Sequence, residues 1–257
     1  MIETFKQNWR VYLMEAAGLA GFVLGAGLLT VFLEHPDFPA MQSSFGGTEN
    51  AIWRRVPLGL LMGAYIALII YLFGEKSGAH INPATTWSFY RLGKIDTANV
   101  VFYTLAQFAG AIAAAQLLKA TLGEWFAHPL VGYGVTKPMP PHDSTEAFVA
   151  EFIISFVLMF AMLIIISSES LEKLAAPVSG VLIALYLIFE LPFSGMSLNP
   201  ARSFGAALAA NKWEHLWIYF VAPPLAMLLA AEIYLRTKTF FPNILDKELP
   251  DYPKEDK

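Results

Sequence analysis

Apolar residues gather along the chain in six long segments, several of which have no polar face. Each is near the ~20 residues with which a helix crosses the hydrocarbon core of a bilayer. A helix that is apolar all round is buried in protein or in lipid. We therefore predict six membrane-spanning helices, over Val11–Leu33, Val56–Phe73, Ala98–Leu118, Phe148–Ile166, Leu174–Phe189 and Leu216–Leu235. Two further apolar stretches are too short to cross alone, Ile81–Tyr90 and Met196–Asn211.

The two halves of the chain repeat one pattern. In the first half Glu15 lies in the first span and SGAHINPATTW follows the second span. In the second half Glu151 lies in the fourth span and SGMSLNPARSF follows the fifth. We expect residues 11–121 and 146–236 to form the two copies. Because each copy has an odd number of spans, the second is inserted upside down, and such inverted repeats place a site at the bilayer midplane.

The tripeptides Asn82-Pro83-Ala84 and Asn199-Pro200-Ala201 predict how the two short stretches fold. Asparagine is a strong N-cap and proline suits the first helical turn, so each tripeptide should start a helix. About ten residues follow each start, roughly 15 Å of helix or half a bilayer. Two such half-helices would meet N-terminus to N-terminus and form a seventh, broken span.

A broken span at this depth predicts a pore. Extended backbone before each half-helix needs partners for its N–H and C=O groups, and at membrane depth it is tolerated where it lines a wet cavity. The two positive helix ends repel cations and leave a path for neutral molecules that form hydrogen bonds. The expected fold is thus an all-α membrane protein with six transmembrane helices plus two re-entrant half-helices.

Charged residues favour cytoplasmic termini, because the larger set of positive charges then lies inside. We expect residues 1–10 to be a cytoplasmic N-terminus that is retained, and residues 237–257 a cytoplasmic tail that is mobile over Pro242–Lys257. The inside set is Lys6, Arg10, Lys76, Arg91, Lys94, Lys173, Arg236, Lys238, Lys247, Lys254 and Lys257; Arg54, Arg55, Lys119, Lys137 and Lys212 fall outside.

Composition excludes several classes of protein. With 56% hydrophobic and 15% charged residues and a mean hydropathy of +0.51, the chain departs from the balance of soluble domains. A pI near 5.7 and a net charge of -4 offer no basic surface for nucleic acid. The absence of cysteine excludes disulfides, thiolate nucleophiles and cysteine-based metal sites. We expect no metal and no cofactor.

The motifs SGAHINPATTW and SGMSLNPARSFG, with the two glutamates, closely resemble the major intrinsic protein family of aquaporins and glycerol facilitators. The resemblance covers residues 10–236. It implies a channel and not an enzyme, one pore per monomer, a homotetramer in the cell membrane among lipid, and water or small neutral solutes as cargo. It also implies that Glu15 and Glu151 brace the re-entrant loops, the rival role for them being proton or ion coupling. The implied carbonyl ladder is Gly78, Ala79, His80, Ile81, Gly195, Met196, Ser197 and Leu198, where His80 lies beside the pore or is simply packed.

The same resemblance places a selectivity filter at Met62, Leu187, Met196 and Arg202. Arg202 fits the family pattern and would repel cations while donating hydrogen bonds to the solute. The other three residues depart from it, since water channels carry an aromatic residue and a histidine, and glycerol facilitators two aromatics. Losing the histidine should widen the constriction and remove a polar contact, which would ease the passage of something larger than water. Methionine is adaptable, however, so side-chain type does not predict the width. Three other features resemble water channels: Ser203, Ala207 and the pair Tyr219-Phe220. Water is the first expectation; glycerol, urea, peroxide, ammonia and metalloid hydroxides stay open.

Two further classes are alternatives. A secondary transporter also uses inverted repeats and broken helices, but the inner stretch of the half-helices carries a single charge, Arg202. An intramembrane hydrolase could use Ser179 or Ser194, each followed by glycine. No histidine lies in the same or a neighbouring span, and the nearest in sequence, His215, is at a predicted membrane edge. Ser-Gly pairs in membrane helices are more often packing sites.

Overall fold

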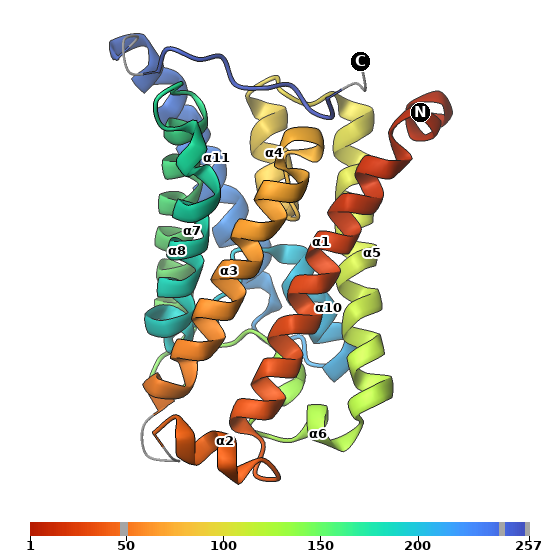
Figure 1. Cartoon of the computed structure of the whole chain (residues 1–257), viewed down its shortest axis with the longest axis vertical. Helices are drawn as coiled ribbons and strands as arrows, with labels where there is room; N and C mark the ends of the chain where they lie inside the picture. Colours follow the sequence, from red (N-terminus) through yellow and green to blue (C-terminus); the bar gives the residue numbers. More distant parts are fainter. Residues whose placement is uncertain (47–50, 242–244, 255–257) are drawn as a thin grey trace.

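The computed structural model describes residues 1–46, 51–241 and 245–254, and every regular element in these ranges is helical. Figure 1 shows the long helices running roughly side by side, with both chain ends at the same end of the bundle. The elements are α1 Ile2–Glu34, α2 Pro39–Ser44, α3 Ala51–Ser77, α4 Pro83–Arg91, α5 Thr97–Leu122, α6 Glu124–Ala127, η1 Gly132–Gly134, α7 Ser144–Ile166, η2 Glu172–Leu174, α8 Ala175–Leu185, η3 Tyr186–Glu190, α9 Leu191–Ser194, α10 Pro200–Ala210 and α11 Leu216–Phe240.

Six helical stretches are long and apolar enough to cross a membrane, as the sequence predicts. The fifth of these, Glu172–Ser194, is interrupted by the π-helical turn η3. Most are longer than the apolar segments because polar residues begin them. The Asp96 side chain accepts hydrogen bonds from the first amides of α5, and Asp143 does the same for α7. Hydropathy alone locates the centre of such a helix and misses its capped ends.

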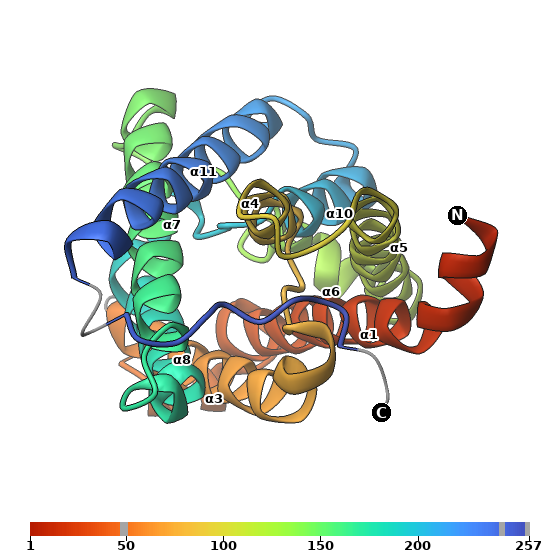
Figure 2. The ribbon, with the colours of Figure 1, turned by 90° about the horizontal axis from the view of Figure 1, so that it is seen from above.

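The six long stretches surround two short helices. Seen from above, α4 and α10 lie inside the ring formed by α1, α3, α5, α7, α8 and α11 (Figure 2). Packing follows the internal repeat: α1 lies against α5 in the first half and α7 against α11 in the second, while α3 packs on α8 between the halves. Most residues of both short helices are buried, although Trp87 and Tyr90 of α4 are 45% and 39% exposed.

The contact between α3 and α8 depends on two glycines at equivalent positions of the two repeats. A Cβ built on Gly63 would lie 2.3 Å from the carbonyl oxygen of Gly180, and one on Gly180 would lie 2.7 Å from that of Gly63. Any side chain would overlap the opposite backbone. The two halves consequently meet backbone to backbone, as small residues allow in membrane helices.

The tail differs from expectation. Residues 242–244 and 255–257 of the predicted mobile extension lie outside the described residues, but residues 245–254, here called the tail segment, pack across the end of the bundle (Figures 1 and 2). Leu245 and Leu249 are 3% and 4% exposed. Backbone amides of Lys247, Tyr252 and Lys254 donate to the carbonyl oxygens of three loop or helix-end residues, Ser167, Lys94 and Lys76, at 3.0, 2.8 and 3.1 Å. The many charged residues of the tail indicated a mobile segment, and not one that is held by buried leucines and backbone hydrogen bonds.

Candidate pore

The two Asn-Pro-Ala tripeptides start α4 and α10. The side chain of Asn82 accepts a hydrogen bond from the Ala84 amide at 2.9 Å. The side chain of Asn199 accepts from the amides of Ala201 and Arg202 at 3.0 and 3.2 Å. The helices that follow have 9 and 11 residues. Local capping thus produces the two half-helices where the sequence predicts them.

The two half-helix starts are joined by a reciprocal pair of hydrogen bonds. Nδ2 of Asn82 donates to the carbonyl oxygen of Leu198 at 2.8 Å, and Nδ2 of Asn199 donates to that of Ile81 at 2.8 Å. Each asparagine therefore caps its own helix with its oxygen and holds the opposite loop with its nitrogen. A carboxamide nitrogen carries two hydrogens, so one N–H of each asparagine is left over.

The backbone before each half-helix adopts matched left-handed conformations. In the first loop φ is +81° at Gly78, +46° at Ala79 and +40° at Ile81. In the second loop φ is +81°, +48° and +60° at the equivalent residues Gly195, Met196 and Leu198. Residues other than glycine rarely adopt such angles, which cost on the order of 1–3 kcal/mol each. Both loops must be held in place by their surroundings.

The two buried glutamates hold these loops. Oε1 and Oε2 of Glu15 accept hydrogen bonds from the amides of His80 and Ile81 at 3.0 and 2.5 Å, and Oε2 also accepts from Gln107 at 2.8 Å. In the second half Glu151 accepts from the amides of Ser197 and Leu198 at 2.6 and 2.8 Å. Both glutamates are 0% exposed. A carboxylate that receives two loop amides keeps the loop carbonyls free to point elsewhere.

A cavity of about 750 Å³ runs beside these loops. Its lining includes residues 78–82 of the first loop, residues 196–199 of the second, and Arg202. Gly195, which we expected in the carbonyl ladder, is not part of the lining. The opposite wall is mostly apolar, with Leu19, Phe22, Ile66, Met159 and Ile183 among its residues. A largely apolar lining with a limited number of polar groups is the usual pattern of a small-molecule site.

The structure divides the four filter residues into two pairs. Met196 and Arg202 line the cavity, and Nη1 of Arg202 is buried without a hydrogen-bond partner in the described part of the chain. Met62 and Leu187 do not line it: they are 2% and 3% exposed and belong to the same apolar cluster as Met196. The packing of side chains from different helices decides which of the four residues reach the cavity.

The tail segment supplies further lining that the sequence did not indicate. Lys247, Pro250, Tyr252 and Lys254 line the cavity at the end of the bundle that carries the chain termini. The ring of Tyr252 lies 5.4 Å from that of His80 and 5.7 Å from that of Phe89, measured between centroids. His80 is 4% exposed and its Nε2 has no partner within the described residues. The sequence feature that could have predicted this docking is the presence of two leucines and a tyrosine in an otherwise charged tail.

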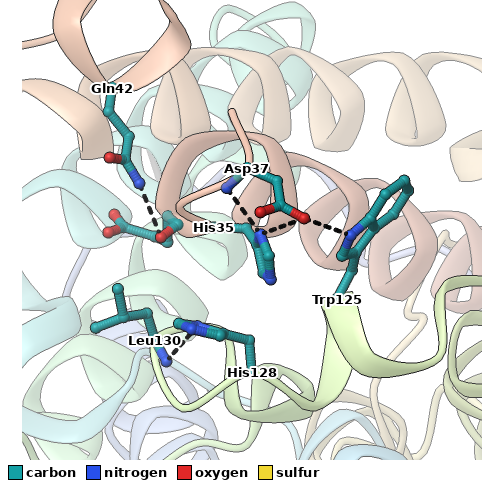
Figure 3. Close-up of polar contacts among 7 residues, drawn as sticks. His35, Asp37, Gln42, Trp125, His128 and Leu130 are labelled. Carbon is teal, nitrogen blue, oxygen red and sulfur yellow. Dashed lines mark hydrogen bonds and ion pairs between the residues drawn. The ribbon is translucent and has the colours of Figure 1, made fainter. Parts of the chain in front are cut away.

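The opposite end of the bundle is tied together by a polar cluster (Figure 3). The His35 ring accepts a hydrogen bond from the Asp37 amide at 3.1 Å, and Oδ2 of Asp37 accepts from the Trp125 indole at 2.9 Å. The rings of His35 and His128 lie 4.5 Å apart. These contacts link the loop after α1 to α6. No group of three or more potential metal ligands occurs in the described ranges.

The family model described as Major intrinsic protein matches residues 26–234. Aquaporin NIP2-1 of Oryza sativa subsp. japonica is 39% identical over 173 residues, which are 67% of this chain and 56% of that protein. Aquaporin-4 of Rattus norvegicus is 35% identical over 196 residues, 74% of this chain and 59% of that protein. The chain thus spans less than two thirds of the length of these relatives.

A solved structure shares the fold. The X-ray structure of the aquaglyceroporin from Plasmodium falciparum superposes with a TM-score of 0.74 at 21% sequence identity, covering 91% of this chain and 98% of that one. Six membrane-crossing helical stretches with two half-helices between them are therefore an established architecture. Together with the aquaporin relatives, they support an integral membrane protein.

Proposed function

The chain belongs to the major intrinsic protein family, and from that premise we propose that it is a passive channel for water that excludes ions and protons. The observation that carries this proposal is the crossed pair Asn82 and Asn199, both of which line the cavity. One N–H of each asparagine is used by the opposite loop. The second is free to donate to a neutral solute that accepts hydrogen bonds, as a water oxygen does.

Electrostatics at the same point support the exclusion of cations. The N-terminal ends of α4 and α10 carry partial positive charge, and neither first turn contains an acidic residue. The carboxylates of Glu15 and Glu151 are directed at backbone amides, away from a role as cation ligands. A cation or a proton carried along a water chain would meet a field of the wrong sign, which is the argument made for aquaporin-type pores.

Family markers beside the filter, weighed slightly above the filter chemistry itself, support water ahead of larger solutes. The cavity reaches Met196 and Arg202, whereas Met62 and Leu187 are packed in the apolar core next to it. Arg202 would be the hydrogen-bond donor at the constriction. Serine at position 203, in place of the aspartate typical of glycerol facilitators, agrees with this choice. Glycerol, urea and metalloid hydroxides are the alternative cargo.

Orientation, assembly and membrane are part of the proposal. We infer that residues 11–121 and 146–236 form one channel unit, with the N- and C-termini cytoplasmic in the cell membrane. Both termini lie at one end of the bundle, which supports a shared side (Figure 1). We further propose a homotetramer embedded in lipid. Chemical cross-linking in native membranes measures the assembly, and labelling of residues near the termini in sealed vesicles measures the side.

The deciding experiment is stopped-flow light scattering of proteoliposomes under sucrose, glycerol and urea gradients. If the protein is a water channel, water leaves the vesicles quickly and they shrink under all three gradients. Re-swelling, which reports the entry of glycerol or urea, then stays as slow as in protein-free liposomes. Rapid re-swelling would identify a facilitator of that solute. Saturating uptake driven by a proton or sodium gradient would show a transporter and overturn the channel.

Arg202→Ala tests the filter. We expect it to raise the leak of cations or the passage of larger solutes, because it removes the one charge on the inner stretch of the half-helices. Lys212→Ala is the matched control, since that exposed lysine follows the end of the same half-helix and does not line the cavity. If Arg202→Ala and Lys212→Ala conduct every solute alike, the filter lies elsewhere.

A further inference from the structure

Glu190 is an acidic residue of the fifth membrane-crossing stretch that lies close to Glu151, and neither the repeat nor the filter accounts for it. It ends the π-helical turn η3, one turn before Ser194. Oγ of Ser194 lies 2.5 Å from Oε1 of Glu190 and 2.8 Å from Oε1 of Glu151, and it accepts a hydrogen bond from the Met196 amide at 3.1 Å. One serine hydroxyl therefore lies between two carboxyl groups.

The number of hydrogens available for these two contacts decides the protonation state of Glu151 and Glu190. A serine hydroxyl has one hydrogen to donate. If it donates to one carboxylate, the short contact to the other is a hydrogen bond only when that second carboxyl group carries a proton. If both carboxyl groups were ionised, one of the two short oxygen–oxygen contacts would have no hydrogen between its atoms and would be repulsive. The geometry thus requires one proton shared between Glu151 and Glu190.

The surroundings assign that proton to Glu190. Glu151 already accepts hydrogen bonds from the Ser197 and Leu198 amides, and donors of this kind favour the ionised form. Glu190 receives no such amides: its Oε2 is buried and has no hydrogen-bond partner within the described part of the chain. An ionised Glu190 would leave a buried negative oxygen unpaired beside a second carboxylate, which is strongly unfavourable.

The first repeat shows the same serine without the acid. Ser77 occupies the position equivalent to Ser194, and the Ala79 amide donates to its Oγ at 3.0 Å. One turn earlier stands Phe73, whose backbone oxygen accepts from Ser77 at 3.3 Å. The loop geometry is the same in both halves, so bracing does not need a carboxyl group at this place. Glu190 is an addition to the half that contains Arg202.

We propose that Glu190 is a neutral positioning residue, which donates its proton to Ser194 and couples the second re-entrant loop to pH. This rests on the proposed channel function. While Glu190 is protonated, Ser194 donates to Glu151 and accepts from Glu190. When Glu190 loses its proton, two negative groups compete for one hydroxyl hydrogen. Ser194 immediately precedes the left-handed stretch 195–198, so its displacement moves that stretch and with it Arg202.

Other charged or titratable groups surround Glu190. On the elements packed against η3 and α9 they are Glu151 of α7, Arg202 of α10, Tyr219 of α11, Arg55 of α3, Tyr186 of η3 itself, and Lys137 and His142 of the preceding loop. Arg55 donates to the Ile188 carbonyl oxygen at 3.5 Å, and His142 stacks on Phe193 at 4.2 Å.

The test compares Glu190→Gln with the wild type in two measurements on the full chain in proteoliposomes. Infrared spectroscopy detects the carbonyl stretch of a protonated carboxylic acid, and stopped-flow light scattering gives water permeability. The glutamine amide donates to Ser194 at every pH, so the variant should conduct as the wild type does at neutral pH. Glu124→Gln, an exposed carboxylate on α6, is the control. It should change neither measurement.

We expect one acid band of the wild type to be missing from Glu190→Gln at neutral pH. As the pH rises, that band and the wild-type permeability should fall together, about tenfold per pH unit beyond the apparent pKa, while Glu190→Gln stays constant. A spectrum identical in wild type and Glu190→Gln overturns the proposal, as does a permeability that falls while the band persists. If neither the wild type nor any variant conducts water faster than protein-free liposomes, the proposed channel function is wrong. The infrared spectra would still show whether Glu190 is protonated.

Discussion

Releasing the tail segment should raise water permeability, because this segment narrows the cavity at the end that carries the chain termini. The double variant Leu245→Ala/Leu249→Ala is the sharpest way to release it. Both leucines are almost fully buried, at 3% and 4% exposure, and a detached tail would expose them to water. Truncating a buried leucine to alanine costs about 2–5 kcal/mol. The pair therefore weakens docking by at least about 4 kcal/mol, which is a several-hundredfold change in the docked to detached ratio.

Two further variants separate docking from obstruction. Glu248→Ala is the control for tail substitution, because Glu248 is exposed and its bond to Lys238 is a surface ion pair of little consequence. Tyr252→Ala removes the ring beside His80 but keeps the backbone bond from residue 252 to Lys94. It should widen the mouth while the tail stays docked. Burial raises the pKa of the Tyr252 phenol well above its ordinary value, with Glu15 adding to the shift, so the ring stays neutral near physiological pH.

The assay pairs stopped-flow permeability with limited trypsin digestion of the same proteoliposomes. Detachment frees the backbone of Lys247 and Lys254 from its hydrogen bonds, and trypsin cleaves such mobile termini readily. We expect the double variant to be both cut faster and more permeable, and Tyr252→Ala to be more permeable without faster cleavage. Faster cleavage of the double variant with unchanged permeability in both variants would refute the reasoning, because the tail would then be docked without limiting flow.

Three other outcomes follow from features of the chain described above. Glu15→Ala should lower stability by roughly 2–6 kcal/mol, since it leaves two buried loop amides without an acceptor at about 1–3 kcal/mol each; thermal unfolding in detergent, against Glu3→Ala on the same helix, measures it. Gly63→Leu should prevent a monodisperse protein on size-exclusion chromatography, whereas Gly74→Ala, whose nearest contact would be an ordinary 3.5 Å, should be tolerated. Mercurials should leave water permeability unchanged because the chain has no cysteine; rapid, reversible inhibition would contradict the assigned pore chemistry.

Sequence predicted best what local chemistry controls. The half-helices start where Asn82 and Asn199 cap them, because capping needs only the residues that follow in the chain. The six spans follow from hydropathy, since lipid imposes a length and a composition. The inverted repeat follows from counting spans between two copies of one motif. These features need no knowledge of distant contacts.

What sequence missed depends on distant contacts. The tail segment docks through backbone bonds to Ser167, Lys94 and Lys76, which no pattern within the tail reveals. Glu190 falls just beyond the predicted end of the fifth span, and its importance comes from Ser194 and Glu151 meeting it in space. The placement of Met62 and Leu187 in the apolar core likewise reflects how side chains from different helices pack.

The crossed asparagine bonds also bear on how such a chain can be divided. Asn82 relies on an acceptor from the second half, and Asn199 on one from the first. Neither half can complete its own loop, and a single half alone would present a buried amide nitrogen with no acceptor and a buried carbonyl with no donor. Expressed as separate polypeptides, the halves should be unstable alone and should fold when produced together. The folding unit is therefore the pair of halves, whichever way the chain connects them.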